Sequence, residues 1–154
     1  MQVSEILKVK GSTLFTVSPQ AMLSECVVTM ADLDIGSLVV MDRGKLAGII
    51  TFREVIRVLA KRQQEHRTGP TPPVAEINIA QVMNSEPIIV SSSMDVNELR
   101  RIMLDTRQRY FPVMDDQVLL GVLSFHDVAR AVLEAQSFEN RMLKAYIRDW
   151  PAEG

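Results

Sequence analysis

Two turns of the sequence place a hydroxyl residue three positions before a carboxylate, Ser124 with Asp127 and Thr51 with Glu54. Each pair stands where a strand-like run gives way to a helical pattern, so its side chains can converge at a helix start. A carboxylate there can accept both hydroxyl hydrogens of a ribose, and the Ser124 hydroxyl adds a further hydrogen bond. Free backbone N–H groups at the helix N-terminus suit a phosphate. Ser124 and Asp127 are therefore the leading candidates for a ribose site.

The same spacing also describes a capping box, which stabilises a helix end and binds nothing. Asp127 is short and leaves its carboxylate free to face outward, which favours ribose binding over capping. Glu54 closes a capping box better, and its extra methylene displaces the carboxylate from the ribose position. We therefore interpret Thr51 and Glu54 as a cap first and as the weaker ribose pair.

Basic residues stand next to both turns. Arg53 and His126 occupy the same place in the first turn of their helices, where a cation opposes the helix dipole, and this suggests another purpose. Arg107, together with Arg109, precedes a strand and can also reach in. These are the candidate phosphate contacts, and the alternative is that each is a solvated surface charge.

One sequence pattern occurs twice in the chain. The run 48–57 returns as 121–130, at an offset of 121 − 48 = 73, and the same offset relates Met41 to Met114 and Met30 to Met103. A repeat in one register decides the architecture before any single residue does. It also predicts two equivalent clefts.

Each copy follows the order strand, helix, strand, strand, helix. In the first copy we expect strands at 14–17, 37–41 and 46–51 and helices at 21–33 and 52–62, the first helix capped by Ser18 with Pro19 in its first turn. In the second copy we expect strands at 88–90, 111–114 and 118–124, a helix at 94–106 and another from about 125. Prolines and a glycine at 67–73 form a linker. The predicted fold is α+β, two β-α-β-β-α motifs at 1–66 and 74–135 packed about a pseudo-two-fold axis as one folding unit, with a helical extension at 136–154.

These repeats resemble the CBS motif, named for its occurrence in cystathionine β-synthase, and the pair resembles a stand-alone Bateman module. Three features carry the resemblance over residues 3–135: IGSLVVMD (35–42) leading into KLAGIIT (45–51), YFPVMD (110–115) leading into LGVLS (120–124), and AQVM (80–83). It implies an adenosine-containing ligand between the motifs, such as AMP, ADP, ATP or S-adenosylmethionine. It also implies a regulatory role toward a partner protein, and no catalysis.

The resemblance further implies an adenine pocket in the second repeat, formed by Val82, Met83, Arg109, Tyr110, Phe111 and Pro112. Pro112 has no N–H and suits the sheet interior poorly, which leaves the backbone groups of Arg109 and Tyr110 to a ligand. The alternative for Phe111 and Met83 is simple core packing.

Composition excludes several other classes of protein. The net charge is −2 over 154 residues, which argues against a general DNA or membrane-surface binder. One cysteine and two histidines offer little to a disulfide framework or a metal. Neither a signal peptide nor an apolar run of membrane-spanning length is found, so we expect a cytoplasmic protein. No set of nucleophile, base and orienting group suggests an enzyme.

The C-terminal tail spaces large apolar residues four apart on a predicted helix: Phe138, Met142, Tyr146 and Trp150, with Leu143 and Ile147 beside them and Pro151 at the end. This stripe can fold back over the module or pack on a second chain. We favour a homodimer, because tryptophan and tyrosine are enriched in interface cores. The competing class is a ligand-free interaction scaffold in which both turns serve only as caps.

Overall fold

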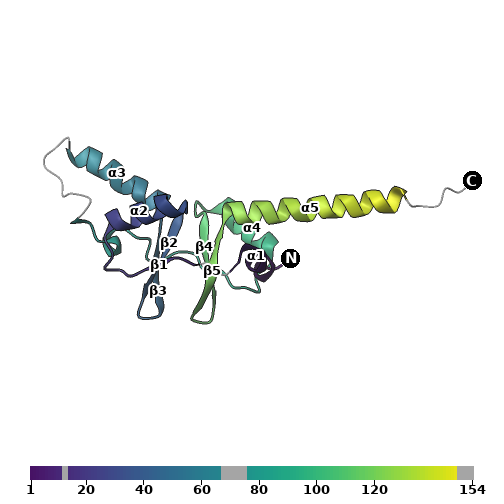
Figure 1. Ribbon diagram of the computed structural model, residues 1–154, viewed down its shortest axis with the longest axis horizontal. Helices are drawn as coiled ribbons and strands as arrows, with labels where there is room; N and C mark the ends of the chain where they lie inside the picture. Colours follow the sequence, from purple (N-terminus) through teal and green to yellow (C-terminus); the bar gives the residue numbers. More distant parts are fainter. Residues whose placement is uncertain (12–13, 67–75, 149–154) are drawn as a thin grey trace, which may run out of the picture.

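Two β-hairpins stand side by side at the centre of the molecule, with helices on either side of them (Figure 1). The computed structural model describes residues 1–11, 14–66 and 76–148. Its elements are α1 (Val3–Lys10), β1 (Thr16–Val17), α2 (Leu23–Leu33), β2 (Ser37–Asp42), β3 (Lys45–Thr51), α3 (Phe52–His66), the 3₁₀ helix η2 (Ile79–Gln81), α4 (Val96–Asp105), β4 (Tyr110–Asp115), β5 (Val118–Ser124) and α5 (Phe125–Arg148). The predicted linker at 67–73 lies outside the described residues.

The two repeats build their sheets with one difference. In the first, β1 runs parallel to β2, which pairs antiparallel with β3. In the second, β4 pairs antiparallel with β5, and the strand predicted at 88–90 is reduced to a single bridge between Val90 and Val113. The Gln108 side-chain amide explains this, because it donates to the Ile88 carbonyl and accepts from the Ile88 N–H, both at 2.9 Å. The backbone of Ile88 is therefore not available to a strand partner.

The predicted N-cap of the first long helix is wrong. Ser18 lies in a turn before the helix, where its carbonyl accepts from the Ala21 N–H, and α2 begins only at Leu23. Met22 is the N-cap and makes no side-chain cap. The Leu23 N–H instead donates to the carbonyl of Ile77, 2.8 Å away in the segment that leads into the second repeat. Tertiary contact has replaced the local cap.

The segment that leads into each repeat packs on the other repeat. Val3 and Ile6 of α1 are buried in the core of the second repeat, together with Phe111 and Leu123. Ile79 of η2 is buried in the core of the first repeat. The stretch 1–66, predicted as one motif, is thus divided between two cores, and neither repeat completes its core without the other.

Matching hydrogen bonds show the pseudo-two-fold relation of the halves. Each leading segment makes two backbone bonds to the start of a helix in the opposite repeat: Val3 N–H to Met94 O at 2.9 Å with Val96 N–H to Met1 O at 2.9 Å, and Ile79 N–H to Ala21 O at 3.0 Å with Leu23 N–H to Ile77 O at 2.8 Å. The helix positions are related by the repeat offset of 73, whereas the leading segments are offset by 79 − 3 = 76. The repeat register therefore slips by three residues ahead of the first strand.

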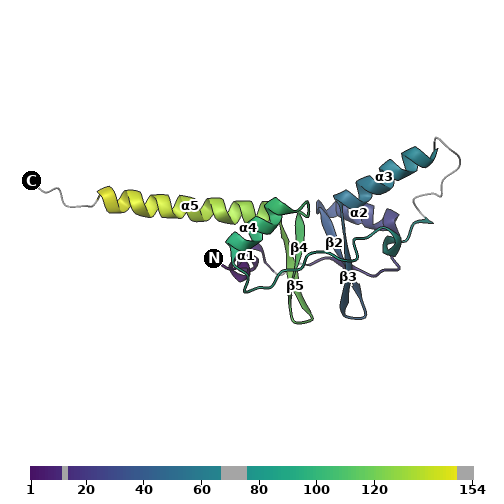
Figure 2. The same cartoon turned by 180° about the vertical axis from the view of Figure 1, so that it is seen from behind.

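The last helix runs on well past the repeat that it belongs to. α5 is continuous over 24 residues, and its C-terminal half extends away from the rest of the molecule (Figures 1 and 2). Its large apolar side chains are exposed there: Phe138, Met142, Leu143, Tyr146 and Ile147. The described part of the tail therefore does not fold back over the module. Trp150 and Pro151 lie outside the described residues.

Candidate ligand-binding site

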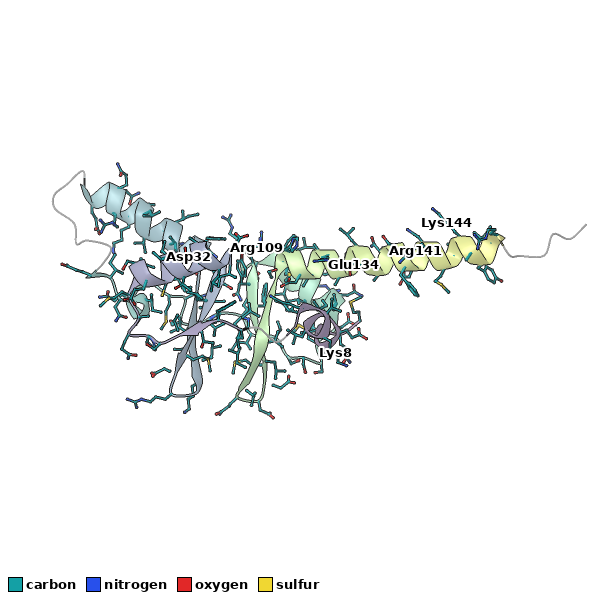
Figure 3. The ribbon with its side chains drawn as sticks, in the orientation of Figure 1. Lys8, Asp32, Arg109, Glu134, Arg141 and Lys144 are labelled. Atoms are coloured by element: carbon teal, nitrogen blue, oxygen red, sulfur yellow. The ribbon has the colours of Figure 1, made fainter. Side chains whose placement is uncertain are left out.

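A cleft lies between the two repeats at the β5–α5 turn, and we name it the Ser124 cleft. Its volume is about 620 Å³. Both halves of the sequence line it, the first with Lys10, Phe15, Asp34, Gly36 and Ser37 and the second with Arg109, Tyr110, Ser124, Phe125 and His126. The leading ribose candidate Ser124 and the phosphate candidate His126 thus lie in one cleft. Figure 3 places Arg109 where the two repeats meet.

Ser124 and Asp127 form the reciprocal bonds of a capping box. The Ser124 N–H donates to Asp127 Oδ2 at 2.8 Å, and the Asp127 N–H donates to Ser124 Oγ at 3.0 Å. The Phe125 N–H donates to the Arg109 carbonyl at 2.8 Å. The expectation of free N–H groups at this turn is wrong for these three residues.

Lys10, for which no sequence pattern predicted a role, also bonds to this turn. Its ammonium donates to Asp127 Oδ2 at 2.7 Å and to the Val122 carbonyl at 2.5 Å. Lys10 lines both the Ser124 cleft and a groove between α1 and α5, and Asp127 lines that groove. Because 117 residues separate the two partners, no local pattern could have found the pair.

The charge of Asp127 has opposing influences. Burial acts to raise its pKa, but the hydrogen bond and charge of Lys10 and the bonds from Ser124 outweigh burial, so the net pKa lies below its ordinary value. The carboxylate is therefore ionised at neutral pH. Burial, and then the Asp127 charge, raise the pKa of the nearby Tyr110 hydroxyl, which stays protonated and able to donate.

Tyr110 stands at the centre of the molecule against Gly36. A Cβ at Gly36 would lie 1.7 Å from the Tyr110 hydroxyl oxygen, so only glycine leaves room for this ring. Tyr110 lines both the Ser124 cleft and a smaller cleft at the β3–α3 turn. The two candidate sites therefore share one wall.

Arg109 is held in place by its own repeat. Its guanidinium donates to the carbonyls of Met103 and Thr106, each at 3.2 Å, and stacks over the Phe125 ring with 5.5 Å to the ring centroid. Its backbone carbonyl accepts from Phe125, and the Tyr110 carbonyl accepts from the Gln108 side chain at 2.9 Å. Each of these two carbonyls thus already accepts one hydrogen bond within the protein, and the prediction that the backbone groups of Arg109 and Tyr110 bind a ligand stays a prediction.

The second site, which we name the Thr51 cleft, has a volume of about 260 Å³ and is lined by Thr51, Arg53, Glu54, Asn84, Arg107 and Tyr110 among others. Glu54 Oε1 accepts from the Thr51 N–H at 2.9 Å and from the Thr51 hydroxyl at 2.7 Å. The Arg53 N–H donates to the Thr51 hydroxyl at 3.1 Å. Glu54 is only 7% exposed. This carboxylate is folded back on its own turn.

The residues predicted to form the adenine pocket do not line a single cavity. Val82 and Met83 lie beside Glu54, in a groove against α3, and are not among the residues that line the Ser124 cleft. Phe111 is fully buried in the second core, and Pro112 is buried in β4. Only Arg109 and Tyr110 of the set line the Ser124 cleft. Among the phosphate candidates, Arg53 and Arg107 share the Thr51 cleft, and His126 belongs to the Ser124 cleft.

The crossing of the leading segments explains this division. AQVM at 80–83 precedes the second repeat in sequence, but η2 carries it onto the first repeat. Gly48 shows how close the approach is, since a Cβ there would lie 2.5 Å from the Asn84 carbonyl oxygen and 2.9 Å from the Met83 sulfur.

Within the described residues, no group of three or more His, Cys, Asp or Glu side chains could hold a metal. No described helix is both long and apolar enough to cross a membrane.

Comparison with known families decides the assignment. The CBS domain model matches residues 3–61 and again residues 79–134, which together are most of the chain. The chain belongs to the CBS domain family. It is a CBS pair, its α+β architecture agrees with the structures of other CBS pairs, and it carries a C-terminal helix.

Similar proteins come from distant organisms. The CBS pair is 28% identical to the mitochondrial CBS domain-containing protein CBSX3 of Arabidopsis thaliana, over 95% of this chain and 71% of that protein. It is also similar to the solved structure of a putative signal-transduction protein with CBS domains from Burkholderia ambifaria, at 28% identity and a TM-score of 0.76, covering 88% of this chain and 96% of that one.

Two solved structures with ligands share the fold. CBSX2 in complex with AMP matches with a TM-score of 0.70 at 21% identity, over 88% of this chain and 98% of that one. The CBS domain pair of MJ0100, in complex with 5′-methylthioadenosine and S-adenosyl-L-methionine, matches with a TM-score of 0.72 at 21% identity over the same shares. At this identity the likeness concerns the fold.

Proposed function

We propose that this CBS pair is a regulatory sensor that binds an adenosine-containing nucleotide in the Ser124 cleft and thereby modulates a partner protein. The observation that carries the proposal is a partly exposed carboxylate, Asp127, which is hydrogen-bonded to Ser124 in the wall of an open cleft lined by both repeats. A ligand that touches both repeats can change how they sit together, which is how a module without catalysis transmits a signal. AMP, ADP, ATP and S-adenosylmethionine are the candidate ligands.

The chemistry of the cleft supports this ligand class. A carboxylate and a serine hydroxyl suit the two hydroxyls of a ribose. Lys10, Arg109 and His126 supply basic groups for a phosphate. Tyr110 and Phe15 offer apolar surface against which a base can pack. The AMP and S-adenosylmethionine complexes of two proteins with the same fold favour the same class.

Isothermal titration calorimetry of the full chain with each of the four ligands tests the proposal. At least one should bind, and Asp127→Asn should weaken that binding roughly tenfold or more, since it removes a charged hydrogen-bond acceptor without changing the shape of the side chain. Glu54→Gln is the matched control at the equivalent position and should leave the affinity within about threefold. Loss of binding in Glu54→Gln but not in Asp127→Asn would move the site to the Thr51 cleft.

One observation favours the second candidate, a ligand-free scaffold. Both carboxylates cap the N-terminus of their helices, and Asp127 Oδ2 already accepts two hydrogen bonds from other groups of the protein. Under this alternative none of the four ligands binds at millimolar concentration. Asp127→Ala would then cost only the stability of a lost cap, about 1 kcal/mol.

We further propose that the partner at α5 is a second copy of this chain. Five large apolar side chains are more than half exposed on the projecting half of the helix: Phe138, Met142, Leu143, Tyr146 and Ile147. Glu134 and Glu139 precede Arg141 and Lys144 along this helix, and Figure 3 shows three of these four residues. An antiparallel pair sets the acidic part of one helix against the basic part of the other.

Light scattering after size exclusion tests the homodimer. The wild-type chain should elute as a dimer, and Met142→Glu should shift it to a monomer without changing its circular dichroism. A monomeric wild-type chain at 100 µM or so would contradict the assignment. Residence in the cytoplasm and regulation of a partner protein stay predictions from the sequence.

A further inference from the structure

The Lys10 ammonium occupies the side of Asp127 that a ribose would need. It donates to Asp127 Oδ2 at 2.7 Å, and its side chain lines the Ser124 cleft on one side and the groove that holds Asp127 on the other. Ser124 lines the cleft, whereas Asp127 lines only the groove. A ligand that enters the cleft therefore meets the Lys10 side chain before it meets the carboxylate.

The other half of the molecule shows that the fold does not need a lysine here. The carbonyl equivalent to that of Val122 belongs to Ile49, since 122 − 49 = 73. The Ile49 carbonyl accepts from the backbone N–H of Asn84 at 2.9 Å, whereas the Val122 carbonyl accepts from Lys10. In the first repeat a backbone N–H thus satisfies this carbonyl, whereas in the second repeat the long, flexible side chain of Lys10 satisfies it.

Lys10 is also better able to move than Arg109, the other long basic side chain of the Ser124 cleft. Arg109 is held by two carbonyls of its own repeat and by the Phe125 ring. The N–H groups of Ser124, Phe125 and Asp127 are engaged within the protein. The Lys10 side chain is 34% exposed and ends in three rotatable donors on a four-carbon stem. An ammonium displaced from Asp127 can therefore follow an anion into the cleft.

We propose that Lys10 is the residue that selects phosphorylated adenosine ligands. This rests on the proposed function, in which the ribose binds Asp127. In the structure Lys10 covers the Asp127 carboxylate. When the ribose hydroxyls bind the Asp127 carboxylate, the Lys10 ammonium moves to the phosphate of the same ligand. A nucleotide restores the ion pair that it breaks, whereas an uncharged nucleoside leaves the ammonium without its anion, and S-adenosylmethionine has no phosphate to offer it.

Calorimetry with AMP and with adenosine, on the full chain, tests the inference through the ratio of the two affinities. The wild-type chain should favour AMP. Lys10→Met should weaken AMP roughly tenfold, because a charge-assisted hydrogen bond to the phosphate is lost. The same variant should tighten adenosine roughly two- to fivefold, because the ribose no longer competes with a partly exposed ion pair. These opposite signs distinguish selection from a general loss of structure.

Lys8→Met is the matched control, since Lys8 is an exposed lysine on the same helix and lines neither the cleft nor the groove. It should leave both affinities unchanged. Lys10→Arg retains the charge and should keep most of the preference for AMP. If Lys10→Met proves too unstable to purify, Lys10→Gln carries the same comparison.

The outcomes separate this inference from the proposed function. Wild-type binding of AMP with an AMP-to-adenosine ratio unchanged in Lys10→Met would overturn the role of Lys10 alone. Equal weakening of both ligands would also overturn it, since that is the mark of a structural residue. A wild-type chain that binds S-adenosylmethionine or adenosine more tightly than AMP contradicts selection by phosphate. Failure of every adenosine compound to bind the wild-type chain would refute the proposed function and this inference together.

Discussion

The Thr51 and Ser124 clefts arise from the same turn in the same fold, but their carboxylates have different surroundings. Glu54 is long enough to fold back, and its Oε1 accepts from both the N–H and the hydroxyl of Thr51. Asp127 is one methylene shorter, accepts from the Ser124 N–H and takes its second bond from Lys10, a residue of another element. The Glu54 carboxylate is bonded within its own turn, whereas the Asp127 carboxylate is also bonded to the partly exposed side chain of Lys10.

The comparison teaches that a capping box and a ligand site are not exclusive alternatives. Asp127 makes the capping bond to Ser124 and still has a partly exposed side chain, 20% accessible, whereas Glu54 is buried. What separates the two turns is the partner that completes each carboxylate. Thr51 of the same turn completes the Glu54 carboxylate, whereas Lys10 of the segment that leads into the first repeat completes the Asp127 carboxylate. The segment that leads into the second repeat bonds through Asn84 to the backbone of Ile49, and not to Glu54.

The largest expected effect on stability concerns the glycines against which the two leading segments pack. Gly48→Ala places a Cβ 2.5 Å from the Asn84 backbone carbonyl and should lower the free energy of unfolding by about 3 kcal/mol. Gly121→Ala at the equivalent position meets only the Leu7 side chain, at 3.0 Å, which can give way, and should cost less than about 1 kcal/mol. Urea denaturation of both variants measures the difference. Equal costs would show that the two crossings are equally tight.

The second effect is on affinity. Asp127→Glu gives the Ser124 cleft the carboxylate of the Thr51 cleft, which is long enough to fold back onto its own turn. We expect nucleotide affinity to fall roughly 10- to 100-fold while the cap is retained. Calorimetry beside a urea titration tells the two apart. Unchanged affinity would show that side-chain length does not distinguish the two turns.

The third effect is on stability alone. Glu54→Ala removes the acceptor of two Thr51 donors and should cost about 1 kcal/mol of unfolding free energy. Nucleotide affinity should not change, because this carboxylate is folded back on its turn. Thermal unfolding and calorimetry on the same sample provide both numbers. A loss of ligand binding without a loss of stability would show that Glu54 is a ligand contact.

The smallest effect is the pH dependence contributed by Asp127. Its folded-state pKa is depressed, so its contribution to stability is complete at neutral pH and is lost as pH falls through the folded-state value, below about 3.9. The pair with Lys10 is partly exposed, which limits the contribution to less than about 1 kcal/mol. The stability difference between wild type and Asp127→Asn, measured at pH 7 and pH 3, should shrink at the lower pH. A difference that grows there would contradict the assigned sign.

Much of the fold could be predicted because its signals are local or periodic. The offset of 73 predicted two equivalent motifs, and the hairpins at β2–β3 and β4–β5 followed from alternating apolar runs between turns. The first helix start could not be predicted from Ser18, since the Leu23 N–H is bonded by Ile77 of the crossing segment. The strand at 88–90 failed for a similar reason, because Gln108 occupies the backbone of Ile88.

By itself, the sequence determined the repeat, the family and the two turns at which Ser124 meets Asp127 and Thr51 meets Glu54. These features depend on residues close together in the chain, where spacing and helix geometry are enough. Only the tertiary structure decided which residues face each turn. The leading segments cross between the repeats because each core is completed by the other repeat's segment. That crossing takes Val82 and Met83 away from Ser124 and brings Lys10 to Asp127 across 117 residues, a contact that only packing creates.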